Sequence, residues 1–246
     1  MTQPDKVEVR TDDGVAPAWI HRPERPGEFP GVIFYPDAGS VRPAMHEMAG
    51  RLAELGYVVL LPHIFYRAGD YAPFDVATVF SVPSERERLM AIVRAHDTKS
   101  AMRDAASYLR TLHAQRGVRR GPVASMGYCI GGRLAFTTAV TYPKDIAAAA
   151  SIHGGGIATD APDSPHREAD KVEARLYFAI SDNDGSCTPE QQGMLVTALA
   201  KAHVRFTVDH FRAAHGFAVS DIPVYDKEAA ETHWRRIEEL FAVAFA

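Results

Sequence analysis

The sequence predicts an α/β fold in which an open, mostly parallel central sheet carries helices on both faces. Short apolar runs alternate with helical segments from residue 31 to the end of the chain, and this alternation is typical of parallel sheets. Of the 246 residues, 46% are hydrophobic, which is enough to bury a full core. No internal repeat, low-complexity tract or shift in composition marks a boundary, so we expect a single domain over residues 1–246.

The first half of the chain begins with two short strands around the turn DDG and then alternates strands with helices. The predicted strands are KVEVRT (6–11), APAWIH (16–21), GVIFY (31–35), YVVLL (57–61) and PVASMGY (122–128). Pro43 suits the first turn of a helix, and a glycine follows Leu55. The predicted helices are Pro43–Leu55 and, after an irregular stretch at residues 63–83, Ser84–Gln115 with a break near residues 96–98.

The second half of the chain continues the same alternation. The predicted strands cover residues 147–153, 174–180 and 204–211, and the predicted helices cover residues 130–140, 189–203 and Val224–Phe245. In sheets of this kind, ligands bind in the loops at the carboxyl ends of the strands. Candidate functional residues are therefore those that directly follow a predicted strand.

Composition and charge exclude several classes of function. The formal net charge of −4 gives no electrostatic footprint for nucleic acid, and the basic cluster RGVRRG (116–121) is typical of a solvated loop. The longest strongly apolar run, Val58–Leu61, is too short to span a bilayer, and the N-terminal residues lack the apolar core of a signal peptide. Two cysteines are too few for a disulfide framework. We therefore expect a cytoplasmic protein, monomeric or a small homo-oligomer, with neither nucleic-acid nor membrane partners.

The stretch SMGYCIGG (125–132) places Cys129 between a predicted strand and a predicted helix, with Gly127 and Gly131 two residues away on either side. Such a sharp strand-to-helix turn strains the central residue and exposes its side chain above the sheet, in the position of a nucleophile. The helix N-terminus stabilises a thiolate, and the N–H of Ile130 is free to face a developing oxyanion. A small buried cysteine in a glycine-rich turn is the alternative interpretation.

A cysteine nucleophile needs a base and an acid that orients the base, and both follow in the expected chain order. Asp182 and Asp184 lie just past a predicted strand, and His215 lies in the loop after the next one. Taken singly, each aspartate suits a turn and the histidine suits the protein surface. Together, in order and on one edge of the sheet, they predict a triad.

The remaining histidines do not suggest a metal site, because the sequence contains no H-E-x-x-H, C-x-x-C or H-x-H motif. His153 also ends a predicted strand beside the proposed site. It is open to two interpretations, as a residue that lines the pocket or as a structural residue. We expect no metal and no organic cofactor.

The motifs GYCIGG, AAHGF and ISDNDGSCTPEQ, together with the block LAELGYVVLLPHIFYR, resemble the dienelactone hydrolase family, the cysteine branch of the α/β-hydrolase fold. The likeness covers nearly the whole chain and implies that Asp184 is the triad acid. It further implies a carboxylate after GVIFYP, where this chain has Asp37 instead of the usual Glu, and Ala38 as the second oxyanion donor. Members acting on anionic dienelactones carry an arginine after the catalytic histidine, and HGFAVSD (215–221) has none.

From these residues we expect hydrolysis of a small ester or lactone through Cys129, His215 and Asp184. Arg86 or Arg88 in SERERL is the candidate for a second substrate-facing arginine of the family. With no arginine after His215, we expect Val219 or a neighbour to fill that space and a more apolar pocket there. Two alternatives remain open: a redox-sensing thiol at Cys129 on a hydrolase scaffold, and a binding protein that has lost its activity.

Overall fold

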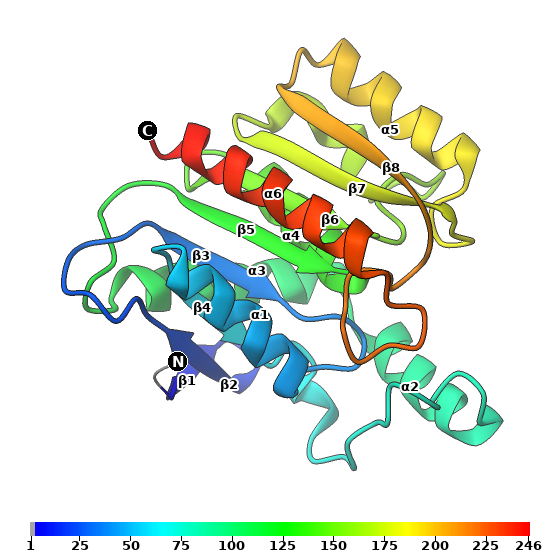
Figure 1. Ribbon diagram of the computed structural model, residues 1–246, viewed down its shortest axis with the longest axis horizontal. Helices are drawn as coiled ribbons and strands as arrows, with labels where there is room; N and C mark the ends of the chain where they lie inside the picture. The colour runs from blue at the N-terminus through cyan, green and yellow to red at the C-terminus, as the bar shows by residue number, and fades with distance from the viewer. Residues whose placement is uncertain (1–2) are drawn as a thin grey trace.

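A computed structural model describes residues 3–246, which fold around one eight-stranded sheet in the order β1-β2-β4-β3-β5-β6-β7-β8 (Figure 1). The β1–β2 and β2–β4 pairings are antiparallel, and the other five pairings are parallel. The strands are β1 (Asp5–Thr11), β2 (Gly14–His21), β3 (Gly31–Tyr35), β4 (Val58–Pro62), β5 (Val123–Tyr128), β6 (Ile146–Ile152), β7 (Arg175–Asn183) and β8 (Phe206–Ala214). The open, mostly parallel sheet expected from the sequence is confirmed.

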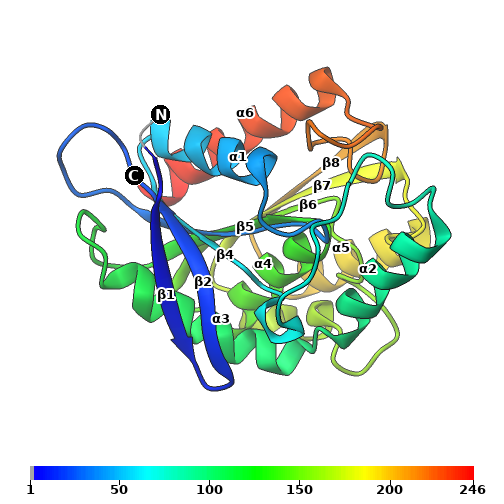
Figure 2. The ribbon, with the colours of Figure 1, turned by 90° about the horizontal axis from the view of Figure 1, so that it is seen from below.

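Helices cover both faces of this sheet, as Figure 2 shows: α1 and α6 lie on one face, and α3, α4 and α5 lie on the other. The α-helices are α1 (Pro43–Glu54), α2 (Pro83–Ala95), α3 (Thr98–His113), α4 (Ile130–Thr141), α5 (Pro189–Lys201) and α6 (Lys227–Ala244). Two short 3-10 helices, η1 (Tyr66–Ala68) and η2 (Pro165–Lys171), connect other elements. Among these helices, none in residues 3–246 has both the length and the apolar composition of a membrane span.

Each face of the sheet has its own apolar core. One core contains Val32, Phe34 and Tyr128 from the strands and Trp234 and Phe241 from α6. The opposite core contains buried residues of α3, α4 and α5, all packed on the other side of the same strands. Because successive strand residues point to opposite faces, strands covered on both sides need the uninterrupted apolar runs that the sequence shows.

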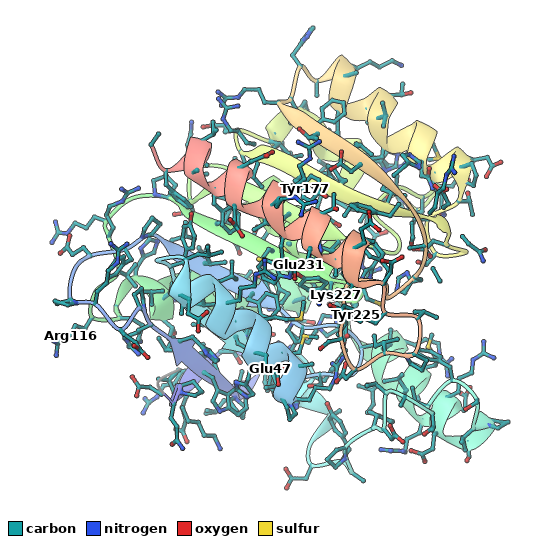
Figure 3. The ribbon with its side chains drawn as sticks, in the orientation of Figure 1. Glu47, Arg116, Tyr177, Tyr225, Lys227 and Glu231 are labelled. Carbon is teal, nitrogen blue, oxygen red and sulfur yellow. The ribbon has the colours of Figure 1, made fainter. Side chains whose placement is uncertain are left out.

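The two helices of the first face are also joined by charge. Arg51 of α1 donates to both carboxylate oxygens of Glu231 in α6, at 2.7 and 2.8 Å. The Arg51 guanidinium lies 4.6 Å from the ring centroid of Trp234, which is also in α6. Figure 3 shows Glu231 on α6 where that helix runs past α1. This contact joins α1 to the first half of α6 and adds to the apolar packing of that helix on the sheet.

Several element boundaries differ from the sequence-based expectation, each because of a side-chain cap or a strand extension. Helix α6 begins at Lys227 rather than Val224, because the Asp226 side chain accepts a hydrogen bond from Ala229 N at 3.0 Å. Asp97 caps α3 in the same way, which sets the predicted break between α2 and α3. Strand β7 continues to Asn183 and therefore includes Asp182.

The parallel strands end at one edge of the sheet, and their register aligns those ends. Tyr35 pairs with Gly127, Gly127 pairs with Ser151, and the next register pair joins Tyr128 to Ile152. Helix α2 projects beyond this edge in Figures 1 and 2. The loops after β3, β5, β6, β7 and β8 therefore meet beside α2, where the functional residues were predicted.

Candidate active site

Cys129 occupies a strained turn between β5 and α4. Its backbone angles, φ 56° and ψ −121°, lie in a region that residues with a side chain rarely adopt. The Cys129 N–H donates to Ile152 O at 3.0 Å, which ties the turn to the end of β6. The turn projects the thiol above the carboxyl edge of the sheet, as the sequence motif predicted.

The glycines around Cys129 are required by contact between backbones. A Cβ added to Gly127 would lie 2.3 Å from Gly131 O, and one added to Gly131 would lie 2.4 Å from the carbonyl oxygens of Tyr35 and Pro36. These distances are far below any allowed contact, and backbone atoms cannot rotate away. The sequence pattern Gly-x-Cys-x-Gly therefore reports the close packing of the turn against the end of β3.

His215 follows β8 and lies against Asp184, with 2.7 Å between His215 Nδ1 and Asp184 Oδ2. The Asp184 side chain is only 2% exposed. It also accepts hydrogen bonds from Ser186 N at 2.8 Å, from Ser186 Oγ and from Ser181 Oγ. Burial works against ionisation, but His215 and Ser186 outweigh it and hold the pKa of Asp184 well below its usual range.

The structure distinguishes the two aspartates that the sequence offered. Asp182 is 48% exposed and lies near His210, at 3.4 Å, on the outside of the sheet. Asp184 is the one that contacts His215. Ser181 and Ser186, which surround Asp184, were not singled out from the sequence, because a serine two or three residues from an aspartate is common in any turn.

Besides Asp184, His215 also contacts the side chain of Cys129. Burial lowers the pKa of His215, but the interactions with Cys129 and the hydrogen bond to Asp184 outweigh it and raise that pKa to about 10. This pKa keeps the imidazole protonated at neutral pH, between Asp184 and Cys129.

Two backbone N–H groups close to Cys129 in the fold are without a protein acceptor among the described residues. In the part of the chain that the structure describes, neither Ala38 N nor Ile130 N donates a hydrogen bond to a protein acceptor. Ala38 lines the cavity beside Cys129, and Ile130 is the first residue of α4. Free N–H groups on two sides of a nucleophile can stabilise a tetrahedral oxyanion.

Asp37 also lines this cavity, but its carboxylate is held away from the role implied by the family resemblance. Both oxygens accept hydrogen bonds from Arg42, at 2.6 and 2.9 Å, and Oδ1 also accepts from Gly39 N at 2.8 Å. The partner of Asp37 is therefore Arg42 and not the thiol. Arg42 was missed from the sequence, because nothing in its local pattern distinguishes it from a surface arginine.

The arginines proposed for substrate binding lie elsewhere. Arg86 is exposed on α2 and is not among the residues that line the cavity. Arg88 pairs with Glu85, donates to Ala72 O at 2.8 Å and stacks 3.9 Å from the ring centroid of Phe74. Neither guanidinium faces Cys129. Arg86 is turned to solvent on α2, so substrate binding by this residue stays a prediction that its position in the structure does not favour.

The cavity itself has a volume of about 440 Å³ and is mostly apolar. Its apolar wall comes from residues 76–80, Leu89 and residues 222–224, and the described residues that line it include no lysine or arginine. Val219 does not line the cavity, since it is fully buried in the core on the α1 and α6 face. Its neighbours Ile222, Pro223 and Val224 line the cavity instead, which agrees with the expectation that Val219 or a neighbour makes this wall apolar.

His153 lines the same cavity and is 1% exposed. Its ring lies 4.8 Å from the His215 ring, in an edge-on orientation. Neither ring nitrogen has a hydrogen-bond partner among the described residues, and burial lowers its pKa far below the usual range. His153 is therefore neutral and packs against the catalytic candidate, so the pocket-lining and structural interpretations both apply to it.

Residues 16–245 match the sequence model of the dienelactone hydrolase family.

The chain belongs to the dienelactone hydrolase family.

Relatives in this family share about a quarter of their residues with the chain. Carboxymethylenebutenolidase 1 of Cupriavidus pinatubonensis is 25% identical, covering 97% of both chains. The carboxymethylenebutenolidase of Pseudomonas sp. strain P51 is 26% identical, covering 91% of this chain and 88% of that protein. The chain is accordingly a carboxylic ester or lactone hydrolase, as the resemblance implied.

Solved structures show the same fold. A dienelactone hydrolase-like promiscuous phosphotriesterase, P91, from metagenomic libraries superimposes with a TM-score of 0.78 at 24% identity, covering all of both chains. The dienelactone hydrolase of Anabaena variabilis superimposes with a TM-score of 0.66 at 18% identity, covering 98% of both chains.

The backbone contacts at the turn predict a strong effect of one methyl group. Gly131→Ala forces a Cβ into two carbonyl oxygens, so we expect it to lower the free energy of unfolding by about 3 kcal/mol or more. Gly193→Ala in α5 is the matched control, because nothing lies within 4 Å of its added Cβ. This control should stabilise the protein by about 0.5–1 kcal/mol. Urea unfolding of both variants measures the difference, and equal effects would contradict the turn geometry.

The acid loop gives a second paired comparison. Asp184→Asn removes the charge that orients His215, so we expect kcat to fall by about 10³- to 10⁴-fold. The substitution also removes an interaction that raises the pKa of His215. The imidazole should therefore lose its proton at a lower pH than in the wild type. Asp182→Asn, on the exposed face, should change kcat by less than about twofold. Steady-state ester hydrolysis across pH 5–10.5 measures both, and reversed effects would identify Asp182 as the acid.

Proposed function

We propose that the chain hydrolyses neutral carboxylic esters or lactones through a triad of Cys129, His215 and Asp184. One observation carries this proposal: Asp184 lies 2.7 Å from His215 beneath a cysteine held on a strained turn. All three groups follow parallel strands at the same edge of the sheet. That arrangement gives each member of the group a separate role in acyl transfer.

The first half of the reaction acylates the cysteine. The Cys129 thiolate attacks the carbonyl carbon, and the N–H groups of Ala38 and Ile130 stabilise the oxyanion that forms. The tetrahedral intermediate collapses when protonated His215 gives its proton to the leaving alkoxide. Asp184 stays ionised throughout and holds the imidazole in place.

The second half releases the acid product. His215, now neutral, takes a proton from water, and the resulting hydroxide attacks the thioester carbonyl. The same two N–H groups stabilise the second oxyanion. Collapse expels the Cys129 thiolate, and the imidazolium–thiolate pair forms again. The protein's own residues supply every proton transfer in this cycle.

The second cysteine bears on the redox alternative. Cys187 is 3% exposed, and burial raises its pKa to about 11. A protonated, buried thiol is a poor partner for disulfide exchange. The Asp184–His215 pair is also unnecessary for a sensor thiol, so these features favour hydrolysis over redox sensing.

The nucleophile is tested by one substitution with a matched control. Cys129→Ala should lower ester hydrolysis by about 10⁴-fold or more while leaving the circular-dichroism spectrum unchanged, because only the reactive atom is removed. Cys187→Ser should keep kcat within about twofold of wild type. The measurement is hydrolysis of 4-nitrophenyl butyrate by each purified variant. Full activity in Cys129→Ala would refute the proposed mechanism.

Substrate charge is tested by comparing two esters. A carboxylate placed in this cavity meets no lysine or arginine among the described lining residues, and an unpaired buried charge costs several kcal/mol. We therefore expect kcat/KM for 4-nitrophenyl butyrate to equal or exceed that for a dienelactone carboxylate at the same pH and salt. Arg86→Ala should leave the ratio unchanged. A preference of a hundredfold for the anion, lost in Arg86→Ala or Arg88→Ala, would show that α2 supplies the missing charge.

A further inference from the structure

Arg42 joins two loops of the site through four hydrogen bonds. It donates to both oxygens of Asp37, at 2.6 and 2.9 Å, and to both oxygens of Asp221, at 2.7 and 2.9 Å. Its side chain is 11% exposed, and that of Asp37 is 6% exposed. Bidentate contacts of this kind fix both distance and orientation. Breaking the buried pair with Asp37 would leave an uncompensated charge, whereas the Asp221 side chain is 34% exposed and its pair is more open to solvent.

The two carboxylates belong to the two loops on which the proposed chemistry depends. Asp37 directly precedes Ala38, whose N–H is one of the proposed oxyanion donors. Asp221 lies in the loop between His215 and α6, next to the apolar wall at residues 222–224. In Figure 1 this loop runs beside the chain segment that enters α1. Arg42 is therefore the bridge between the loop of the oxyanion donor and the loop of the base.

The loop that carries Ala38 needs such a support. Ser40 has a φ of 63°, a left-handed conformation that serine rarely adopts. Arg42 donates to Ser40 O at 3.2 Å as well as to Asp37. Strained loop conformations persist where surrounding contacts hold them, and Arg42 contacts the loop on both sides of Ala38.

Charge gives Arg42 a second effect on the site. Asp37 lines the same cavity as Cys129, and a free carboxylate near a thiol disfavours the thiolate. The other titratable groups around Cys129 are His215 with Asp184 behind it, His153, and Arg133 in the first turn of α4. Among the described residues that line the cavity, Asp37 is the acidic one. Both of its carboxylate oxygens accept hydrogen bonds from the Arg42 guanidinium.

We infer that Arg42 is a positioning residue of the active site, which holds the Ala38 oxyanion loop to the His215 loop and neutralises Asp37 beside the Cys129 thiolate. This inference rests on the proposed function, because it assigns Arg42 a role in the same reaction. Two separable effects follow from it. Loss of the bridge misplaces an oxyanion donor, and loss of the charge leaves Asp37 free to oppose the thiolate.

The experiment uses the full chain with Cys187→Ser, so that alkylation by iodoacetamide reports on Cys129. The measurements are kcat and KM for 4-nitrophenyl butyrate and the pH at which the alkylation rate is half maximal. Arg42→Met should lower kcat by about 10- to 100-fold with KM changed less than about threefold, since displaced donors act on the transition state. The alkylation midpoint should rise by about one pH unit, because Asp37 has lost its partner.

Two further variants separate charge from geometry. In Arg42→Met with Asp37→Asn, the alkylation midpoint should return to the wild-type value while kcat stays low, because the unpaired charge is gone but the bridge is not restored. Asp221→Asn should lower kcat severalfold and leave the alkylation midpoint unchanged, because Asp37 keeps its partner. Arg42→Lys keeps the charge without the planar fork, so it should also lower kcat at an unchanged midpoint. If Arg42→Met does not fold, Arg42→Lys tests the positioning role by itself, and kcat within twofold of the parent would overturn that role.

Three outcomes would overturn the inference. Folded Arg42→Met with kcat within twofold of the parent removes the positioning role. An unchanged alkylation midpoint in that variant removes the charge role, and so does a raised midpoint that Asp37→Asn fails to restore. These outcomes are distinct from failure of the proposed function, which appears as ester hydrolysis that persists in Cys129→Ala. The alkylation assay needs no substrate and therefore tests Arg42 whichever ester the chain prefers.

Discussion

The close approach of the β5–α4 turn to the end of β3 is the contact on which the rest of the site depends. With glycine at 127 and 131, backbone meets backbone, and α4 begins directly against the loop that follows β3. This contact holds Cys129 and the start of α4 next to the loop that carries Ala38. A side chain at Gly131 would push the turn away from that loop, so the proposed site depends on main-chain packing as well as on its reactive side chains.

The charged residues around the cavity form two separate groups, which differ in their contacts. Asp184, His215 and Cys129 form a chain of contacts, and they are the residues to which we assign proton transfer. Asp37, Arg42 and Asp221 form a static group with its hydrogen bonds largely satisfied, at the border between two loops. Between the groups lies an apolar cavity, and the low polarity of its wall strengthens the electrostatic interactions on either side.

The fold and the three proposed reactive residues could be predicted from the sequence because their signals are local. Apolar runs show the buried strands, glycine spacing shows the turn at Cys129, and each candidate directly follows a strand. Arg42 and Ser186 could not be predicted, because their roles depend on how loops far apart in sequence fold against each other. The position of Arg86 could not be predicted for the same reason. The sequence shows that α2 is rich in charged residues, but not which side of the helix faces the cavity.

One wall of the cavity is supported differently from the rest of the molecule. Phe74, Val79 and Leu89 form a small apolar cluster of their own, apart from the two cores of the sheet, and Leu89 is the one buried residue of α2. A segment with so little buried surface opens at a lower free energy than the sheet does. Opening of residues 74–95 would therefore change access to the cavity while the residues at the ends of the strands stay in place.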